Sequence, residues 1–299
     1  MKKNFVKRVL TAGLALCMVA SMAACGSKEA ANSTDADSGV KPVLLAVSFG
    51  TSFNNSRDIT IGAVEKALQD ANPDYEVRRA FTSQIIIDKL KDRDNIEIDN
   101  VKEAMDRLVT DGVKDVVIQP THVMPGFEYN DVLDEVNTYA DKFNSLKIGS
   151  ALLTTDEDFD TLAGVLNDIT ADYQADDTAV IFMGHGTEHE ANGTYAKLQE
   201  KIDDKGIKNM FIGTVEAEPS LDDVVKMAKD AKVKKVVLRP LMIVAGDHAN
   251  NDMAGDEKDS WKSTFEKEGF EVECVLEGLG QVEGVQQMIV KHAQEAMAK

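Results

Sequence analysis

The sequence predicts an α/β protein made of two similar Rossmann-like domains, each with a parallel sheet, and a cleft between them. Two observations lead to this expectation. Apolar runs of strand length alternate with amphipathic stretches from residue 41 onward, and the second half repeats parts of the first. Apolar runs without polar alternation, separated by helical segments, are typical of parallel strands joined by crossover helices. The composition, with 43% hydrophobic and 28% charged residues among 299, is that of a globular protein.

Eight apolar runs are predicted to form strands, four in each half of the chain. They cover residues 42–49, 76–81, 114–120, 146–153, 179–183, 210–215, 235–241 and 272–276. Helical spacing of apolar positions predicts helices between them, at residues 57–70, 84–90, 101–108, 195–202, 221–231, 257–268 and 282–298. The link at 172–177 is mostly polar, so we expect one domain over 41–175 and a second over 176–299.

An internal repeat supports two related halves. Val113–Pro120 aligns with Val233–Pro240 at an offset of 120 residues, and five of the eight positions are identical. At the same offset, Glu128 falls on His248. The loops that follow the strands form the ligand crevice of open α/β sheets. We therefore expect the Glu128 and His248 loops to face one cleft.

Two histidines follow predicted strands, at the edge where α/β proteins hold catalytic groups. His185 lies between two glycines, which let the backbone turn sharply, in a segment (GHGT) that matches residues 48–51 (SFGT). His248, Glu216 and Glu128 also follow strands. Two imidazoles and a carboxylate suit a divalent ion such as Co, Fe, Ni or Zn. Because His185 and His248 are 63 residues apart, they form no compact zinc motif, and solvated loop histidines stay an alternative.

The other three histidines have weaker signals. His189 follows His185 by four residues in a loop-like segment and is expected to be peripheral. His122 follows the third strand and either lines the cleft or packs in the core. His292 lies on the last helix and is expected to be solvated.

Several function classes are excluded by what the sequence lacks. The formal net charge of −19 argues against nucleic-acid binding, which needs clustered Lys and Arg. Neither a phosphate-binding Gly-x-x-x-x-Gly-Lys-Ser/Thr loop nor a Gly-x-Gly-x-x-Gly loop is present, so no nucleotide cofactor is expected. Residues 48–52 do not form a nucleophile elbow.

Residues 1–25 are typical of a lipoprotein-type signal peptide. A basic start is followed by an apolar stretch over 9–20 and by Ala23-Ala24-Cys25. The cysteine after two alanines resembles a bacterial lipobox, with Met22 where Leu is usual. Residues 26–40 are expected to be a flexible tether. The prediction is therefore an exported protein, lipid-anchored at Cys25 to the extracytoplasmic side of the cell membrane. An ordinary signal peptide with an incidental cysteine is the alternative.

At these loops the chain resembles the anaerobic sirohydrochlorin cobaltochelatases, of the class II chelatase superfamily. The resemblance runs from about Lys41 to the C-terminus. The most specific segment is Arg239–Ala254 (RPLMIVAGDHANNDMA). The other matching segments are VSFGTS at 47–52, RAFTS at 79–83, MGHG at 183–186, GTVE at 213–216, DSWK at 259–262 and EGLG at 277–280.

The resemblance implies ATP-independent insertion of Co²⁺ into sirohydrochlorin in anaerobic cobalamin biosynthesis, with Fe²⁺ or Ni²⁺ as other metals. It places the proton-accepting histidine at His185 and the metal ligands at His185, Glu216 and His248. A further active-site glutamate falls on Glu128. The motif loops place substrate-binding residues at Ser48, Phe49, Gly50, Thr51, Arg79, Met242 and Asp247.

Charge creates a conflict for such a substrate. Sirohydrochlorin carries many carboxylates, and removal of residues 1–24 would bring this chain to −23, because it takes away Lys2, Lys3, Lys7 and Arg8 and no acidic residue. The cleft is therefore expected to hold local positive groups, with Arg57, Arg79, Arg239 and Lys262 as candidates. Ordinary surface or strand-end charges are the alternative for these four.

Two other functions stay open. A membrane-tethered carrier of haem, another tetrapyrrole or a metal ion, descended from a chelatase, would fit the export signal. A solute-binding lipoprotein of a metal importer would also have two α/β lobes, although the chelatase-like motifs argue against it. A homo-oligomer is also left open by the sequence.

Overall fold

The computed structural model describes residues 39–299, and these form one compact unit. The predicted signal peptide, and the tether as far as residue 38, lie outside the described residues. Among residues 39–299, no helix combines the length and the apolar character needed to cross a membrane.

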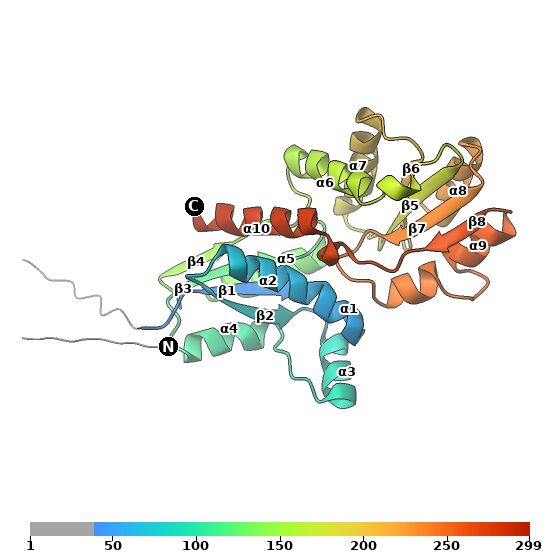
Figure 1. Cartoon of the computed structure of the whole chain (residues 1–299). Coiled ribbons are helices and arrows are strands. Elements are labelled where there is room, and N and C mark those ends of the chain that lie inside the picture. Colours follow the sequence, from blue (N-terminus) through green and yellow to red (C-terminus); the bar gives the residue numbers. More distant parts are fainter. Residues whose placement is uncertain (1–38) are drawn as a thin grey trace, which may run out of the picture. The chain divides into compact units, whose positions relative to one another are not determined.

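Two parallel four-stranded sheets organise the chain (Figure 1), which confirms the predicted α/β class. The first has the order β2-β1-β3-β4, and its strands are β1 (Val43–Ser48), β2 (Glu76–Phe81), β3 (Asp115–Pro120) and β4 (Ser145–Ile148). The second has the order β6-β5-β7-β8, and its strands are β5 (Thr178–Gly184), β6 (Met210–Thr214), β7 (Lys235–Pro240) and β8 (Glu271–Cys274). All strand pairs are parallel.

Helices cover both faces of each sheet. In the first half they are α1 (Asn54–Ile59), α2 (Ile61–Ala71), α3 (Gln84–Asp94), α4 (Val101–Thr110), α5 (Phe127–Asn137) and α6 (Asp156–Asp168). In the second half they are α7 (Gly193–Asp204), α8 (Leu221–Asp230), α9 (Trp261–Lys267) and α10 (Glu283–Met297), with a π-helix at Ala249–Met253. Short 3₁₀ turns lie at Ala171–Tyr173, Glu190–Asn192 and Leu279–Gln281.

The central strands of both sheets are buried because they are apolar on both faces. All residues of β1 and β5 are buried. On one face of the first sheet, α4 and α5 pack over Leu45 and Ile118, and on one face of the second, α8 and α9 pack over Ile181 and Leu238. A third cluster joins the opposite faces of both sheets through α2, α6, α7 and α10. Burial of each such aliphatic side chain contributes about 1.5–3 kcal/mol.

The last helix of each half crosses to the other half. Helix α10 packs against α2, β3 and β4 of the first sheet, whereas α6 packs against α7 beside the second. The strands of the first sheet precede residue 175 in the sequence, and those of the second follow it. Helices α6 and α10, however, each pack against elements from the other side of this predicted boundary.

The repeat detected in the sequence is confirmed by matching topology and matching hydrogen bonds. Both sheets have the same strand order, with β1 equivalent to β5 and β3 to β7. In the first sheet the Ser83 N–H donates to the carbonyl of Phe49 (3.2 Å), and in the second the Glu216 N–H donates to that of His185 (2.9 Å). The pairs Phe49/His185 and Ser83/Glu216 are therefore equivalent in the two sheets.

Some elements differ from the sequence prediction. The strand predicted at 146–153 ends at Ile148. Just beyond it, the Gly149 N–H donates to the Ile118 carbonyl (2.8 Å), and the side-chain amide of Gln119 donates to the Ser150 carbonyl (3.0 Å). The helix predicted at 57–70 breaks at Thr60, whose hydroxyl donates to the Ser56 carbonyl (2.6 Å). Helices α5 and α6 were not predicted at all. Helix α6 begins with a capping box between Thr155 and Asp158.

Candidate active site

The loops after β1, β3, β5, β6 and β7 line one cavity of about 530 Å³. This is a usual volume for a small-molecule site. Both halves contribute to its wall, as the carboxyl ends of parallel strands predict. The predicted site residues in the wall are Ser48, Phe49, Gly50, Thr51, Glu128, His185, Glu216, Met242, Asp247 and His248.

His185, Glu216 and His248 converge on one point of this wall. One possible ligand atom from each residue lies within 4.8 Å of the others. The imidazole rings of His185 and His248 meet edge to face, with centroids 4.6 Å apart, and Nδ1 of His185 lies 3.8 Å from the Glu216 carboxylate. Two imidazoles and a carboxylate at this spacing can close around a divalent cation of the Co²⁺ or Fe²⁺ type.

Hydrogen bonds orient both imidazoles for metal binding. Nδ1 of His185 lies 2.8 Å from the Gly186 carbonyl, which can only accept, so Nδ1 carries the proton. Nδ1 of His248 donates to the Asp252 carboxylate at 2.6 Å. In both rings Nε2 is left to bind a metal, and a carboxylate behind a metal-binding histidine raises its basicity.

Local structure fixes each of these side chains. Gly186 has φ +87°, and a Cβ there would lie 2.8 Å from the Ala217 nitrogen, so the sharp turn at His185 requires glycine. His248 is the N-cap residue of the π-helix, and Asp252 lies in that helix, four residues further along the chain. π-helical turns are frequent at functional sites.

Two supporting residues were missed by sequence reasoning. In the sequence Asp252 shows only as a His-x-x-x-Asp spacing. That spacing brings the two side chains together only if the segment is helical, which the sequence did not indicate. Tyr195 of α7 accepts the Gly186 N–H at 3.1 Å and is buried beside the His185 loop. Tyr195 belongs to no motif of the sequence, so no pattern indicated this contact.

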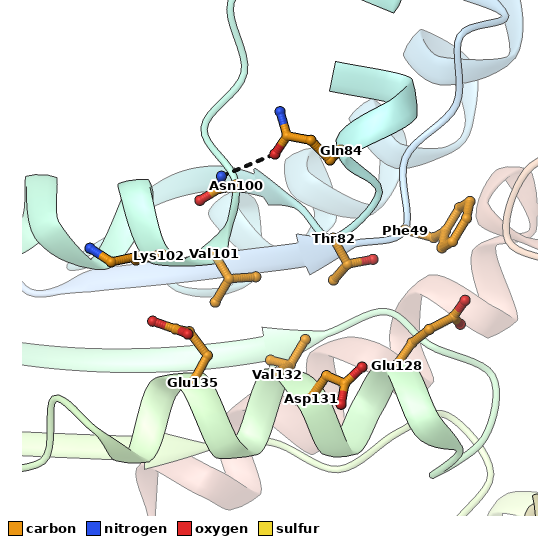
Figure 2. Close-up of a pocket in the computed structure, with 10 residues that line it drawn as sticks. All are labelled: Phe49, Thr82, Gln84, Asn100, Val101, Lys102, Glu128, Asp131, Val132 and Glu135. Carbon is orange, nitrogen blue, oxygen red and sulfur yellow. Dashed lines mark hydrogen bonds between the residues drawn. The ribbon is translucent and has the colours of Figure 1, made fainter. Parts of the chain in front are cut away.

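Glu128 lies on the first-sheet side, where the cavity meets a side groove of about 350 Å³. Figure 2 shows Glu128, Asp131 and Glu135 along one side of α5, with Phe49 opposite Glu128. Desolvation raises the pKa of Glu128, and the charges of Asp131 and Glu216 act in the same direction. A carboxyl with a raised pKa is suited to accept a proton near neutral pH.

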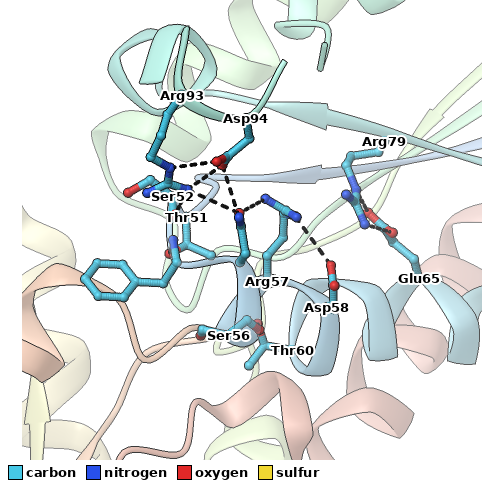
Figure 3. A network of polar contacts seen from close by, with 12 residues as sticks. Thr51, Ser52, Ser56, Arg57, Asp58, Thr60, Glu65, Arg79, Arg93 and Asp94 are labelled. Atoms are coloured by element: carbon cyan, nitrogen blue, oxygen red, sulfur yellow. Dashed lines mark hydrogen bonds and ion pairs between the residues drawn. The ribbon is translucent and has the colours of Figure 1, made fainter. Parts of the chain in front are cut away.

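None of the four cations expected in the cleft lines the cavity, and these include Arg79, which was predicted to bind substrate. Its guanidinium makes two hydrogen bonds of 2.6 Å to Glu65 (Figure 3) and lies over the ring of Phe81. Arg57 is buried and bonds to Asn54.

The remaining two candidates are also paired elsewhere. The Arg239 guanidinium is buried, where it bonds to Glu277 (2.7 Å). Lys262 pairs with Asp256 (2.7 Å). The described residues that line the cavity include four carboxylates and no Lys or Arg: Glu128, Glu188, Glu216 and Asp247.

The other histidines take different places. His189 lies outside the metal group, the name used here for His185, Glu216 and His248. Its ring contacts that of Phe127, with centroids 4.7 Å apart. The expectation that His292 is solvated is wrong, because α10 packs against α6 and His292 bonds to buried Asp158 at 2.9 Å. His122 borders the cavity.

Solved chelatase structures share the fold. SirB from Bacillus subtilis, solved with Fe³⁺, superposes with a TM-score of 0.60 and covers 87% of this chain and 96% of its own, at 12% identity. CbiX, described as the terminal enzyme for biosynthesis of siroheme in denitrifying bacteria, has a TM-score of 0.52 and covers 85% of this chain and 99% of its own, at 13% identity.

Sequence comparison is more specific. The sirohydrochlorin cobaltochelatase of Salmonella typhimurium is 38% identical over 258 residues, which cover 86% of this chain and 97% of that protein. The sirohydrochlorin cobaltochelatase CbiKC of Nitratidesulfovibrio vulgaris is 32% identical over 263 residues, covering 86% and 91%. The family model for cobalt chelatase (CbiK) matches residues 42–298. The chain therefore belongs to the cobalt chelatase (CbiK) family.

Proposed function

We propose that this protein is a sirohydrochlorin cobaltochelatase, an enzyme of the lyase class that inserts Co²⁺ into sirohydrochlorin without ATP, in the anaerobic route to cobalamin. The observation that carries the proposal is the convergence of His185, Glu216 and His248 on the wall of a cavity between the two sheets. Sequence similarity to relatives named sirohydrochlorin cobaltochelatase supports sirohydrochlorin as the substrate.

The chemistry requires the metal ion to enter as two inner N–H protons leave the macrocycle. His185 and His248 present two Nε2 lone pairs, and Glu216 presents a carboxylate, to the metal ion, which is the second substrate. As the ion passes to the ring nitrogens, His185 is released and can accept one proton. Glu128 can accept the other, because desolvation raises its pKa. From Glu128 the acidic side groove leads away from the cavity.

The test is an anaerobic mixture of protein, sirohydrochlorin and Co²⁺, followed by absorbance. We expect insertion well above the spontaneous rate, abolished in His185→Ala. His189→Ala is the matched control, because His189 lies nearby but outside the metal group, and it should retain the wild-type rate. A wild-type rate equal to the spontaneous one would reject the enzyme.

A carrier is the second candidate, because the N-terminal sequence favours export and sirohydrochlorin is made in the cytoplasm. Tight tetrapyrrole binding without metal insertion in the same assay would support it. Cobalt is the proposed metal. Fe²⁺ and Ni²⁺ accept the same ligands, so a competition series among the three ions decides the preference.

We also propose that Cys25 is lipidated and tethers the protein to the extracytoplasmic face of the cell membrane. The lipobox-like sequence before Cys25 supports this. Expression with a labelled fatty acid tests it. The label should enter the membrane fraction with the wild type and be lost in Cys25→Ala, while label retained in that variant would reject the anchor.

A further inference from the structure

The cavity lacks an obvious partner for a carboxylate-rich ligand. Its lining holds four carboxylates and no Lys or Arg among the described residues, and the four cations considered above are paired elsewhere. Only an imidazole in this wall can gain a positive charge. His185 and His248 belong to the metal group, which leaves His122 as the third.

His122 is partly exposed, but both nitrogens of its ring are buried without a partner. An unpaired buried donor or acceptor destabilises the folded protein, so such a group in a ligand cavity is a candidate for binding the ligand. The outer torsion of a histidine side chain is broad, so a small ring rotation can present a nitrogen to the cavity that His122 borders.

The repeat shows that packing does not require an imidazole here. The His122 carbonyl accepts the Leu152 N–H (2.9 Å), and at the equivalent position of the second sheet the Met242 carbonyl accepts the Leu279 N–H (2.8 Å). Both side chains line the cavity. The same backbone position therefore carries an apolar side chain in one sheet and an unpaired imidazole in the other.

We propose that His122 is a substrate-binding residue that holds a carboxylate of the tetrapyrrole through a charge-assisted hydrogen bond. This inference rests on the proposed function and identifies how an acidic cavity accepts an acidic substrate. When the carboxylate binds, the ring takes a proton from solvent and forms an imidazolium–carboxylate pair.

The electrostatic surroundings agree with this role. Burial lowers the pKa of His122 to about 4, so the ring is neutral in the free protein at neutral pH, and no neighbouring charge contributes to the shift. The carboxylates of the same cavity are Glu128, Glu188, Glu216 and Asp247. Its other titratable groups are Tyr129, His185, Tyr195 and His248. A bound carboxylate would raise the pKa of His122 and cause proton uptake.

Calorimetry with metal-free sirohydrochlorin tests the proposal under anaerobic conditions, at pH 6, in two buffers of different ionisation enthalpy. The wild type should take up a fraction of a proton on binding. His122→Met, which copies the equivalent position, should bind about 10- to 100-fold more weakly and without that uptake. His122→Gln should recover part of the affinity, because its amide donates, but no proton uptake. Thermal unfolding of each variant confirms that it is folded.

Two controls separate the possible failures. Glu128→Gln should keep the proton uptake, which excludes Glu128 as its source. Co²⁺ affinity should be unchanged in His122→Met, and its loss would identify a metal ligand instead and overturn the proposal. Unchanged tetrapyrrole affinity and proton uptake in that variant would also overturn it. If the wild type binds no sirohydrochlorin, the proposed function fails together with this inference.

Discussion

The loops of the two sheets share a backbone frame but carry different chemistry. In the second sheet the three equivalent positions converge on a group that could hold a metal ion, and in the first they hold an aromatic, a hydroxyl and a carboxyl side chain. The pairs are His185 with Phe49, Glu216 with Ser83 and His248 with Glu128. In the proposed function the two halves therefore have different roles: the second supplies the metal ligands, and the first faces the macrocycle.

Removal of a metal ligand gives the largest expected effect. His248→Ala should lower Co²⁺ affinity by about 100-fold or more, because it takes one of three ligand atoms from the group. At the equivalent position, Glu128→Ala should leave Co²⁺ affinity within about 2-fold while slowing insertion. Titration calorimetry with Co²⁺ alone measures the Co²⁺ affinity of both variants, and the absorbance assay measures insertion. Equal losses in the two variants would contradict the division between the halves.

The carboxylate behind His248 comes next. Asp252→Asn keeps the shape of the side chain but removes the charge that accepts the Nδ1 proton at 2.6 Å. We expect a 10- to 100-fold loss of Co²⁺ affinity. The first sheet has Val132 at the equivalent position, so no such support exists there. Affinity equal to that of the wild type would show that the π-helix alone orients His248.

The two glycine turns permit a matched test of stability. Gly186→Ala and Gly50→Ala both place a side chain at positive φ, and both new methyl groups collide, with the Ala217 backbone and the Phe81 ring respectively. Each should lower the free energy of unfolding by about 1–3 kcal/mol. Only Gly186→Ala should also weaken Co²⁺ binding, because it moves His185. Denaturant titration and calorimetry separate the two effects, and weakened Co²⁺ binding in both would argue against separate roles.

Tyr195→Phe gives the smallest expected change. It leaves the Gly186 N–H without its acceptor and should destabilise the protein by about 1 kcal/mol, with a modest loss of Co²⁺ affinity. Tyr129→Phe is the control from the first sheet, where the hydroxyl donates to Gly149 (3.3 Å). It should not alter Co²⁺ affinity. An identical loss in both variants would show that Tyr195 does not position the His185 loop.

Much of the site could be anticipated because it lies in loops next to apolar strands. The runs at 179–183 and 235–241 marked where β5 and β7 end, and the residues that follow such strands share one edge of a sheet. His185, Glu216 and His248 were therefore predictable as neighbours. The family resemblance added their roles.

The errors arose where side chains found partners that are distant in sequence. Arg79 was expected in the cleft, but Glu65, on the adjacent α2, binds its guanidinium. His292 was expected in solvent, but α10 crosses to the first sheet and brings it to Asp158. Neither partner is visible in the local pattern.

The chain by itself determined most of its strands, its repeat and the positions of its candidate metal ligands, because apolar period and loop position are local properties. Only the tertiary structure decided which charges are neutralised, which imidazoles carry a carboxylate behind them and which one stays unpaired at the cavity wall. Hydrogen-bond partners and desolvation depend on the three-dimensional neighbours of a group, and packing of the helices across the two halves sets those neighbours.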